Sequence, residues 1–342
     1  MNRKILFILL LLCSGTFAFT MLVSWNMKLP EPKLAAIEAS VIKSFSLLQE
    51  SGVKFIAQGK CAGCHHSTLT SMVAEKMRSK GITKVDTTAA LRVMAMSNTV
   101  RFVCNPNLNN QFVQAKFLAP YVLLGLGAED YPADLNTDIA VDYLMGQELS
   151  DGSFKAEYIR VPLECGDIHL TAFATRAIQL YASPAMALRV KKLVTQTRDW
   201  LEKQNPVDQQ EIAFQLLGLQ WTSGSVAAKK AAAQRLLSLQ RSDGGWSQLP
   251  TMQSDAYATG QALFALSEAG LMGENPDAYE HGIDFLLKTQ DSSGAWIVTT
   301  RSNPIQPYIN VDFPPYDENQ YISAAATNWA ALALVNALPK KR

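Results

Sequence analysis

Apolar residues recur at helical spacing along most of the chain, in segments of two alternating kinds. One kind carries charge, as in 187–203, and suits an outer helix that is exposed on one side. The other is rich in small residues on all faces and suits a helix packed on several sides. The pattern predicts an all-α fold of about six pairs: 35–50 with 66–80, 86–101 with 110–127, 137–149 with 168–182, 187–203 with 208–222, 226–240 with 255–270, and 277–290 with 320–337.

Comparing the chain with itself reveals a repeat at the ends of the charged segments. Residues 236–246 recur as 285–296, and both copies contain Q-x3-G-x-W. A weaker copy occupies 143–154 and a degenerate one occupies 200–204. Such self-similarity indicates a repeat architecture. Six pairs can close into one α/α barrel, whereas an open solenoid would need polar caps at both ends.

The two clear repeats resemble the QW motifs of squalene–hopene cyclases, in the superfamily shared with protein prenyltransferase β subunits. The resemblance implies a single α/α toroid over 33–338, with the repeats clearest in 137–338. In that family the glutamine and tryptophan tie the end of one outer helix to its neighbour. The structural residues implied here are Gln240, Trp246, Gln290 and Trp296.

This chain also departs from the cyclases. Squalene cyclases are longer and have a second toroid, whereas 342 residues leave room for one. Their catalytic acid lies in a D-x-D-D motif, which this sequence lacks. Four acids instead stand four apart, which predicts a solvated helix face: Asp130, Asp134, Asp138 and Asp142. The resemblance therefore favours the fold more than the activity.

Residues 1–26 predict a signal peptide or a membrane anchor. Basic residues precede the apolar run 5–12, and a small-residue cleavage site ends at Ala18. The absence of charge between Lys4 and Lys28 also fits an uncleaved anchor, which could span a bilayer. The positive flank directs the rest of the chain outward in either case, so we expect an exported, periplasmic or outward-facing protein.

The motif Cys61-Ala62-Gly63-Cys64-His65-His66 carries the most specific chemistry. C-x-x-C-H is the attachment signature of c-type haem, in which two thiols bond the haem and the histidine binds the iron. It assigns Cys61 and Cys64 to attachment and His65 to the iron. Against haem, no separate cytochrome domain is present, because residues 67–80 belong to a predicted barrel helix.

A metal site is the second interpretation of this motif. The repeat register aligns Cys64 with Cys165 and His66 with Asp167, at the starts of inner helices that would converge at one barrel mouth. Cysteine, histidine and aspartate bind zinc, and three of them with a water form a catalytic centre. The candidate ligands are Cys61, Cys64, His65, His66, Cys165, Asp167, His169 and Asp255. A disulfide, Cys61–Cys64 or Cys64–Cys165, with no cofactor is the third interpretation.

Two further features are ambiguous in the sequence. Glu211, at the start of an inner helix, is either a pocket acid or a charge that stabilises a helix N-terminus. The segment 301–321 lacks helical spacing and is rich in proline and aromatic residues. It is either a cap over one barrel mouth or rigid packing over the last pair.

The charge balance excludes a nucleic-acid partner, because 31 basic residues nearly cancel 30 acidic ones. Three functions remain open. The first is a haem- or metal-bearing redox or binding protein that uses Cys61, Cys64 and His65 and has a redox partner. The second is a metal-dependent or cyclase-like enzyme acting on an isoprenoid or other apolar substrate. The third is a non-catalytic ligand- or protein-binding module.

Overall fold

The computed structural model describes residues 29–60, 62–103, 115–156, 160–302 and 311–341. Within these ranges the chain forms twelve α-helices, and its only β contacts are isolated bridges, so the predicted all-α fold is confirmed. None of these described helices is both long and apolar enough to cross a membrane. The predicted signal or anchor segment, 1–26, lies outside the described residues.

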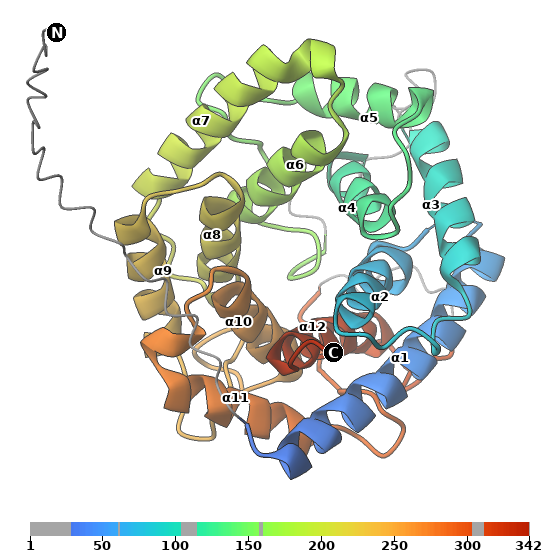
Figure 1. The fold of residues 1–342 in the computed structure, drawn as a ribbon, viewed down its shortest axis with the longest axis vertical. Coiled ribbons are helices and arrows are strands. Elements are labelled where there is room, and N and C mark those ends of the chain that lie inside the picture. Colours follow the sequence, from blue (N-terminus) through green and yellow to red (C-terminus); the bar gives the residue numbers. More distant parts are fainter. Residues whose placement is uncertain (1–28, 61, 104–114, 157–159, 303–310, 342) are drawn as a thin grey trace, which may run out of the picture.

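The helices form two concentric rings (Figure 1). The outer ring contains α1 (Glu31–Gly59), α3 (Ala89–Val103), α5 (Leu135–Met145), α7 (Ala187–Lys203), α9 (Val226–Ser238) and α11 (Pro276–Thr289). The inner ring contains α2 (Leu69–Ser79), α4 (Ala115–Ala128), α6 (Asp167–Tyr181), α8 (Gln209–Trp221), α10 (Ala256–Glu268) and α12 (Gln320–Ala337). Each outer helix is followed by an inner one, as the hydrophobic pattern predicts.

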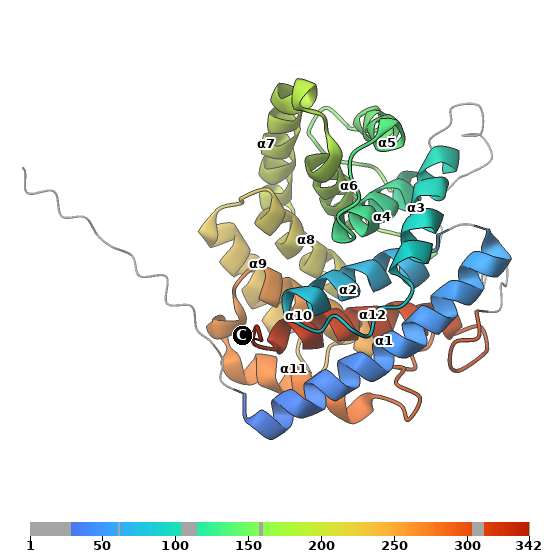
Figure 2. The same ribbon diagram turned by 45° about the vertical axis from the view of Figure 1, so that its right-hand side comes forward.

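Contacts between the two ends of the chain close the rings. Each inner helix contacts the next, and α12 contacts α2. In the outer ring α11 contacts α1, which also lies beside α12 (Figure 2). The fold is therefore a closed α/α toroid, and the open-solenoid alternative is excluded.

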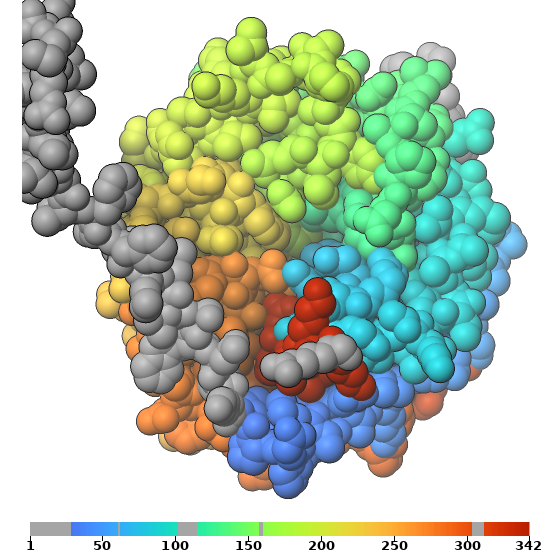
Figure 3. Space-filling model, in the orientation of Figure 1, coloured from blue at the N-terminus to red at the C-terminus, as the bar shows by residue number. Residues whose placement is uncertain are grey.

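Burial explains the two kinds of helical sequence. Outer helix α7 buries only Leu193, Thr197 and Leu201, all on one face. Inner helix α12 is buried continuously from Ile322 to Val335. Small residues allow this close packing: a Cβ on Gly260 of α10 would lie 2.5 Å from the backbone of α12. Side chains fill most of the space that the ribbons leave open in the ring (Figure 3).

The glutamines of the two clear repeats join neighbouring outer helices. The Gln240 side chain, after α9, donates to the carbonyl of Ala278 in α11 at 2.7 Å. The Gln290 side chain, after α11, donates to the carbonyl of Ser40 in α1 at 3.1 Å. The second bond links helices at opposite ends of the chain, so it helps to close the outer ring.

The tryptophans of the same repeats are fully buried beneath these junctions. The indole N–H of Trp246 donates to the Leu236 carbonyl at 2.7 Å, and that of Trp296 donates to the Leu286 carbonyl at 2.9 Å. Their backbone N–H groups donate to threonines of inner helices, Thr259 in the first case. Each tryptophan therefore fixes an outer helix, the following turn and an inner helix together.

Candidate functional site

Residues 160–166, which precede α6, form a turn that lies across the toroid axis. In Figure 1 the green chain leading into α6 is visible at the centre of the ring. Its Pro162 carbonyl accepts a hydrogen bond from the Gln210 side chain of α8 at 3.0 Å. The Tyr257 hydroxyl of α10 donates to the Gln210 side-chain oxygen, also at 3.0 Å. The turn is therefore attached to the N-terminal ends of two inner helices.

His169 lies beneath this turn, fully buried on α6. Its Nδ1 is 3.2 Å from the Cys165 carbonyl, which only accepts, so Nδ1 carries the proton. Nε2 is then an acceptor for the Tyr121 hydroxyl at 3.1 Å. Burial lowers the pKa of His169 to about 3, so its imidazole is neutral at pH 7.

Aromatic rings from several inner helices surround His169. Phe214 of α8 stacks on the imidazole, with ring centroids 3.9 Å apart. Phe117 and Tyr121 of α4 and Phe173 of α6 meet it edge-on. Trp329 of α12 contacts Phe214 in turn. We call these six residues the axial cluster: Phe117, Tyr121, His169, Phe173, Phe214 and Trp329.

Only one of the two histidines of the sequence motif, His65, lies beside this cluster. Cys64–Thr68 forms a single π-helical turn that leads into α2. The His65 ring meets Tyr121 edge-on at 5.4 Å, and neither ring nitrogen has a hydrogen-bond partner among the residues that the structure describes. His66 points elsewhere, since its ring stacks on Phe55 of α1 at 5.0 Å. Burial is the main cause that lowers the pKa of both histidines, to about 3 for His66, so both are neutral at pH 7.

The turn across the axis also contains a buried ion pair. Arg160 Nη1 lies 3.2 Å from Glu164 Oε1, and only 4% of Glu164 is exposed. The second oxygen of Glu164 is buried, and no described residue forms a hydrogen bond with it. Burial raises the pKa of Glu164, and the charge of Arg160 opposes that shift. This carboxyl group therefore lies in surroundings that favour its protonated form more than water does.

Glu211 is used to stabilise a helix. Its Oε2 accepts a hydrogen bond from the backbone N–H of Ile168, at the start of the neighbouring inner helix α6, at 3.1 Å. Burial nevertheless raises its pKa to about 7. The structure therefore supports the helix-stabilising interpretation of Glu211, with one oxygen left buried and unpaired.

The aspartates of the predicted metal set have local roles. Asp255 caps α10 by accepting from the Ala258 N–H at 2.9 Å, and it also accepts from the Gln248 side chain. Asp167 pairs with Lys155 at 2.6 Å near the surface. In the described part of the chain, no three His, Cys, Asp or Glu side chains come together closely enough to hold a metal ion.

Of the predicted cysteine ligands, Cys165 can be described and Cys61 cannot. Cys165 is a buried free thiol, so the Cys64–Cys165 disulfide is absent. Its Sγ lies 3.5 Å from the Pro162 carbonyl, and burial raises its pKa to about 12, which makes it a poor nucleophile and metal ligand. Cys61 lies outside the described residues, so its predicted roles stay predictions.

The proline- and aromatic-rich segment 301–321 is described only in part. Residues 303–310 lie outside the described part. The portion that follows is packed: Val311 and Phe313 are fully buried with Leu48 of α1 and Ala324 of α12. That portion is rigid packing over the last helical pair.

Sequence reasoning missed most of the axial cluster. The signal was an i, i+4 pairing of aromatic residues on two successive inner helices, Phe117 with Tyr121 and His169 with Phe173. Phe214 and Trp329 carry no such local signal, because only ring closure brings α8 and α12 to the same axis.

No protein-family model matches the chain. Among solved structures, it is similar to the type II terpene cyclase MstE from Scytonema. A complex of MstE with its substrate geranylgeranyl dihydroxybenzoate aligns with a TM-score of 0.60 at 14% identity, over 90% of this chain and 99% of that one. A complex of MstE with its product, merosterolic acid A, aligns with a TM-score of 0.58 at 15% identity, again over 90% of this chain and 99% of that one. The fold is that of a terpene cyclase toroid. At this identity the likeness concerns the fold alone.

Proposed function

We propose that this chain is a cyclase-like toroid that binds an isoprenoid or similarly apolar ligand among its inner helices. The observation that carries the proposal is the axial cluster, in which aromatic side chains from four inner helices meet around a neutral histidine. The fold adds support, because MstE has the same architecture and binds a geranylgeranyl compound.

The chemistry of the axial cluster suits an apolar chain. Aromatic side chains offer large apolar surfaces, and their faces also stabilise a cation that develops in a bound ligand. His169 and His65 are neutral at pH 7, so neither adds a positive charge that would oppose such a cation. The hydroxyl of Tyr121 is already satisfied by His169. The cluster therefore has few polar groups that a ligand would need to satisfy with hydrogen bonds.

Cyclisation would also require an acid. Glu164 is our candidate, because it is buried on the turn across the axis and its pKa is raised. It would protonate the ligand through Oε2, the oxygen that Arg160 does not contact. In an assay with a polyprenyl substrate, Glu164→Gln should abolish turnover while ligand affinity stays within about twofold. Equal turnover by Glu164→Gln would exclude Glu164 as the acid.

Binding itself is tested with geranylgeraniol as the probe. Tryptophan fluorescence should show saturable binding, and Phe214→Leu should weaken it about tenfold because a stacking face is lost. Phe45→Leu is the matched control, since Phe45 is equally buried but lies on outer helix α1. Absence of saturable binding, or equal weakening by both substitutions, would contradict the proposal.

Covalent haem is a second candidate, favoured by one observation. Both ring nitrogens of His65 are buried without a hydrogen-bond partner, as an unused iron ligand would be. We also retain export as a proposal, because haem attachment to Cys61 and Cys64 requires it. The test is the visible spectrum of protein produced with the haem-attachment machinery. A Soret band that survives denaturation supports haem, and a colourless protein excludes it.

A further inference from the structure

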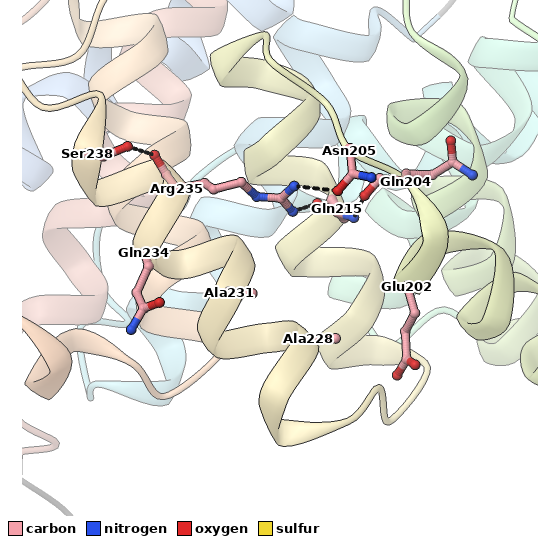
Figure 4. Close-up of a pocket in the computed structure, with 9 residues that line it drawn as sticks. All are labelled: Glu202, Gln204, Asn205, Gln215, Ala228, Ala231, Gln234, Arg235 and Ser238. Carbon is pink, nitrogen blue, oxygen red and sulfur yellow. Dashed lines mark hydrogen bonds between the residues drawn. The ribbon is translucent and has the colours of Figure 1, made fainter.

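A groove of about 440 Å³ lies between outer helices α7 and α9, away from the axial cluster (Figure 4). Its lining includes Glu202 at the end of α7, Asn205 in the following linker, Gln215 of α8, and Ala231 and Arg235 of α9. This volume is within the range of small-molecule sites.

The groove exists because one repeat is degenerate. Between α9 and α10 the chain uses residues 239–255, and their glycine turn covers the next outer helix. There Gly244 lies so close to His281 of α11 that an added Cβ would be 2.6 Å from its carbonyl oxygen. Between α7 and α8 the linker is only 204–208 and has no such turn. Ala231, which occupies on α9 the register of His281, lines the groove instead.

Arg235 supplies the charge in this groove. Its guanidinium donates to two amide oxygens, Gln215 Oε1 at 2.6 Å and Asn205 Oδ1 at 3.3 Å. Gln215 is itself fixed, because its Nε2 donates to the Leu201 carbonyl at 2.7 Å and to a second carbonyl. An arginine has five N–H donors, so three have no partner among the described residues, and one of these, on Nε, is buried.

No carboxylate neutralises Arg235 within the described residues. Glu202, the acid in the lining, accepts from the Ser225 backbone N–H at 2.8 Å. In Figure 4 its side chain points away from the guanidinium. The buried Arg92 differs, because it pairs with both Asp86 and Glu129. Arg235 is thus an oriented guanidinium with neutral partners at the wall of a groove.

We propose that this groove binds a small organic anion, a carboxylate or a phosphate monoester, through Arg235. Both groups match the planar donor set of a guanidinium and form charge-assisted hydrogen bonds. The amide groups of Asn205 and Gln215 hold the guanidinium in place before the ligand arrives, which reduces the entropy lost on binding. The site is independent of the apolar site proposed above.

Calorimetric titration of the full chain with succinate, and separately with glycerol phosphate, tests the site. Wild-type protein should bind at least one probe saturably, and the stronger probe identifies the anion class. Arg235→Gln should weaken binding at least about tenfold. Arg198→Gln is the matched control, since this arginine of α7 pairs with Asp199 and is not among the residues that line the groove. It should bind as the wild type does.

A second substitution keeps the arginine and the shape of the groove. Asn205→Asp places a carboxylate against the Arg235 guanidinium, so it should also weaken anion binding about tenfold while the fold is retained by circular dichroism. Absence of saturable binding of either probe to the wild type would overturn the proposal. Undiminished binding by Arg235→Gln or Asn205→Asp would also overturn it.

Discussion

At the scale of single residues, the protein buries histidines in neutral form. His169 is fixed in one tautomer by the Cys165 carbonyl and the Tyr121 hydroxyl, and burial lowers its pKa to about 3. Protonation would place a charge on a fully buried side chain that water does not reach, and this loss of solvation is what lowers the pKa. The axial cluster is therefore built for a neutral imidazole.

This arrangement predicts a specific pH dependence of stability. Below pH 6.5 His169 becomes protonated in the unfolded state, whereas in the folded state it stays neutral down to about pH 3. Stability contributed by this residue is complete above pH 6.5 and is lost as the pH falls through that window. In chemical denaturation, the free energy of unfolding of the wild type should fall more steeply than that of His169→Gln, by about 1.4 kcal/mol per pH unit. The difference at pH 8 measures the loss of packing and of the two hydrogen bonds of His169, without a contribution from its titration. Parallel pH curves would show that His169 is protonated normally in the folded protein.

Gly166 provides a second test at this scale. It has φ of +96°, and an added Cβ would lie 1.9 Å from Glu211 Oε1. Gly270 is the matched control, because its φ is +70° but nothing lies within 4 Å of its added Cβ. Gly270→Ala should cost about 1 kcal/mol from backbone strain, and Gly166→Ala about 2 kcal/mol more from the clash. Urea denaturation measures both, and equal costs would mean that Glu211 moves aside freely.

At the scale of helices, hydrogen bonds between outer helices convert a string of pairs into a ring. Gln290 is the most important of these residues, because its side chain reaches Ser40 of α1 from the end of α11. It also donates to the Gly294 carbonyl at 3.0 Å, which fixes the following turn. The bond to α1 connects residues that are far apart in the sequence, so the propensity of either helix to form does not compensate for its loss.

Gln290→Ala should therefore destabilise the protein by about 1–3 kcal/mol, because two carbonyl groups lose their donor. Amide hydrogen exchange should accelerate at the junction of α1 and α11. Gln204→Ala is the control, since within the described part of the chain the Gln204 side chain donates to the Trp200 carbonyl of the helix that it follows and to no other outer helix. It should change stability by less than about 0.5 kcal/mol. Uniformly faster exchange in all helices would contradict a local closing role.

The helices themselves were predictable from sequence. Charged segments such as α7 and small-residue segments such as α12 differ visibly, because one lies on the outside and the other is enclosed. The structural roles of Gln240 and Trp246 were implied by the resemblance to QW motifs; in the structure Gln240 donates to the Ala278 carbonyl of α11, and the Trp246 indole donates to the Leu236 carbonyl of α9. The predicted helix bounds lie within about five residues of the observed ones, except that α1 continues to Gly59 where the sequence predicts an end at residue 50.

The composition of the axial site was not predictable in the same way. His65 and His169 were identified by their chemical type, and the structure brings both to the Tyr121 ring. Phe214 and Trp329 were missed because an aromatic residue on a buried helix has the same pattern in a core and in a binding site. Asp167 and Asp255 were candidate ligands in the metal interpretation; in the structure Asp167 pairs with Lys155 near the surface and Asp255 caps α10.

At the scale of the whole molecule, closure of the ring arranges the six inner helices around one common axis. Side chains from α4, α6, α8 and α12 meet around His169, and all four helices belong to the inner ring (Figure 1). The same closure brings the turn containing Arg160 and Glu164 over the axis. Fold and candidate site therefore have one physical origin.

The most direct test of this account is to locate a bound prenyl chain. Purified protein would be irradiated with a diazirine-bearing geranylgeranyl probe, and the labelled peptides would be identified by mass spectrometry. We predict labels on peptides from α4, α6, α8 and α12, suppressed by excess geranylgeraniol and reduced in Phe214→Leu. Labels confined to outer helices, or insensitive to geranylgeraniol, would contradict an apolar ligand site within the toroid.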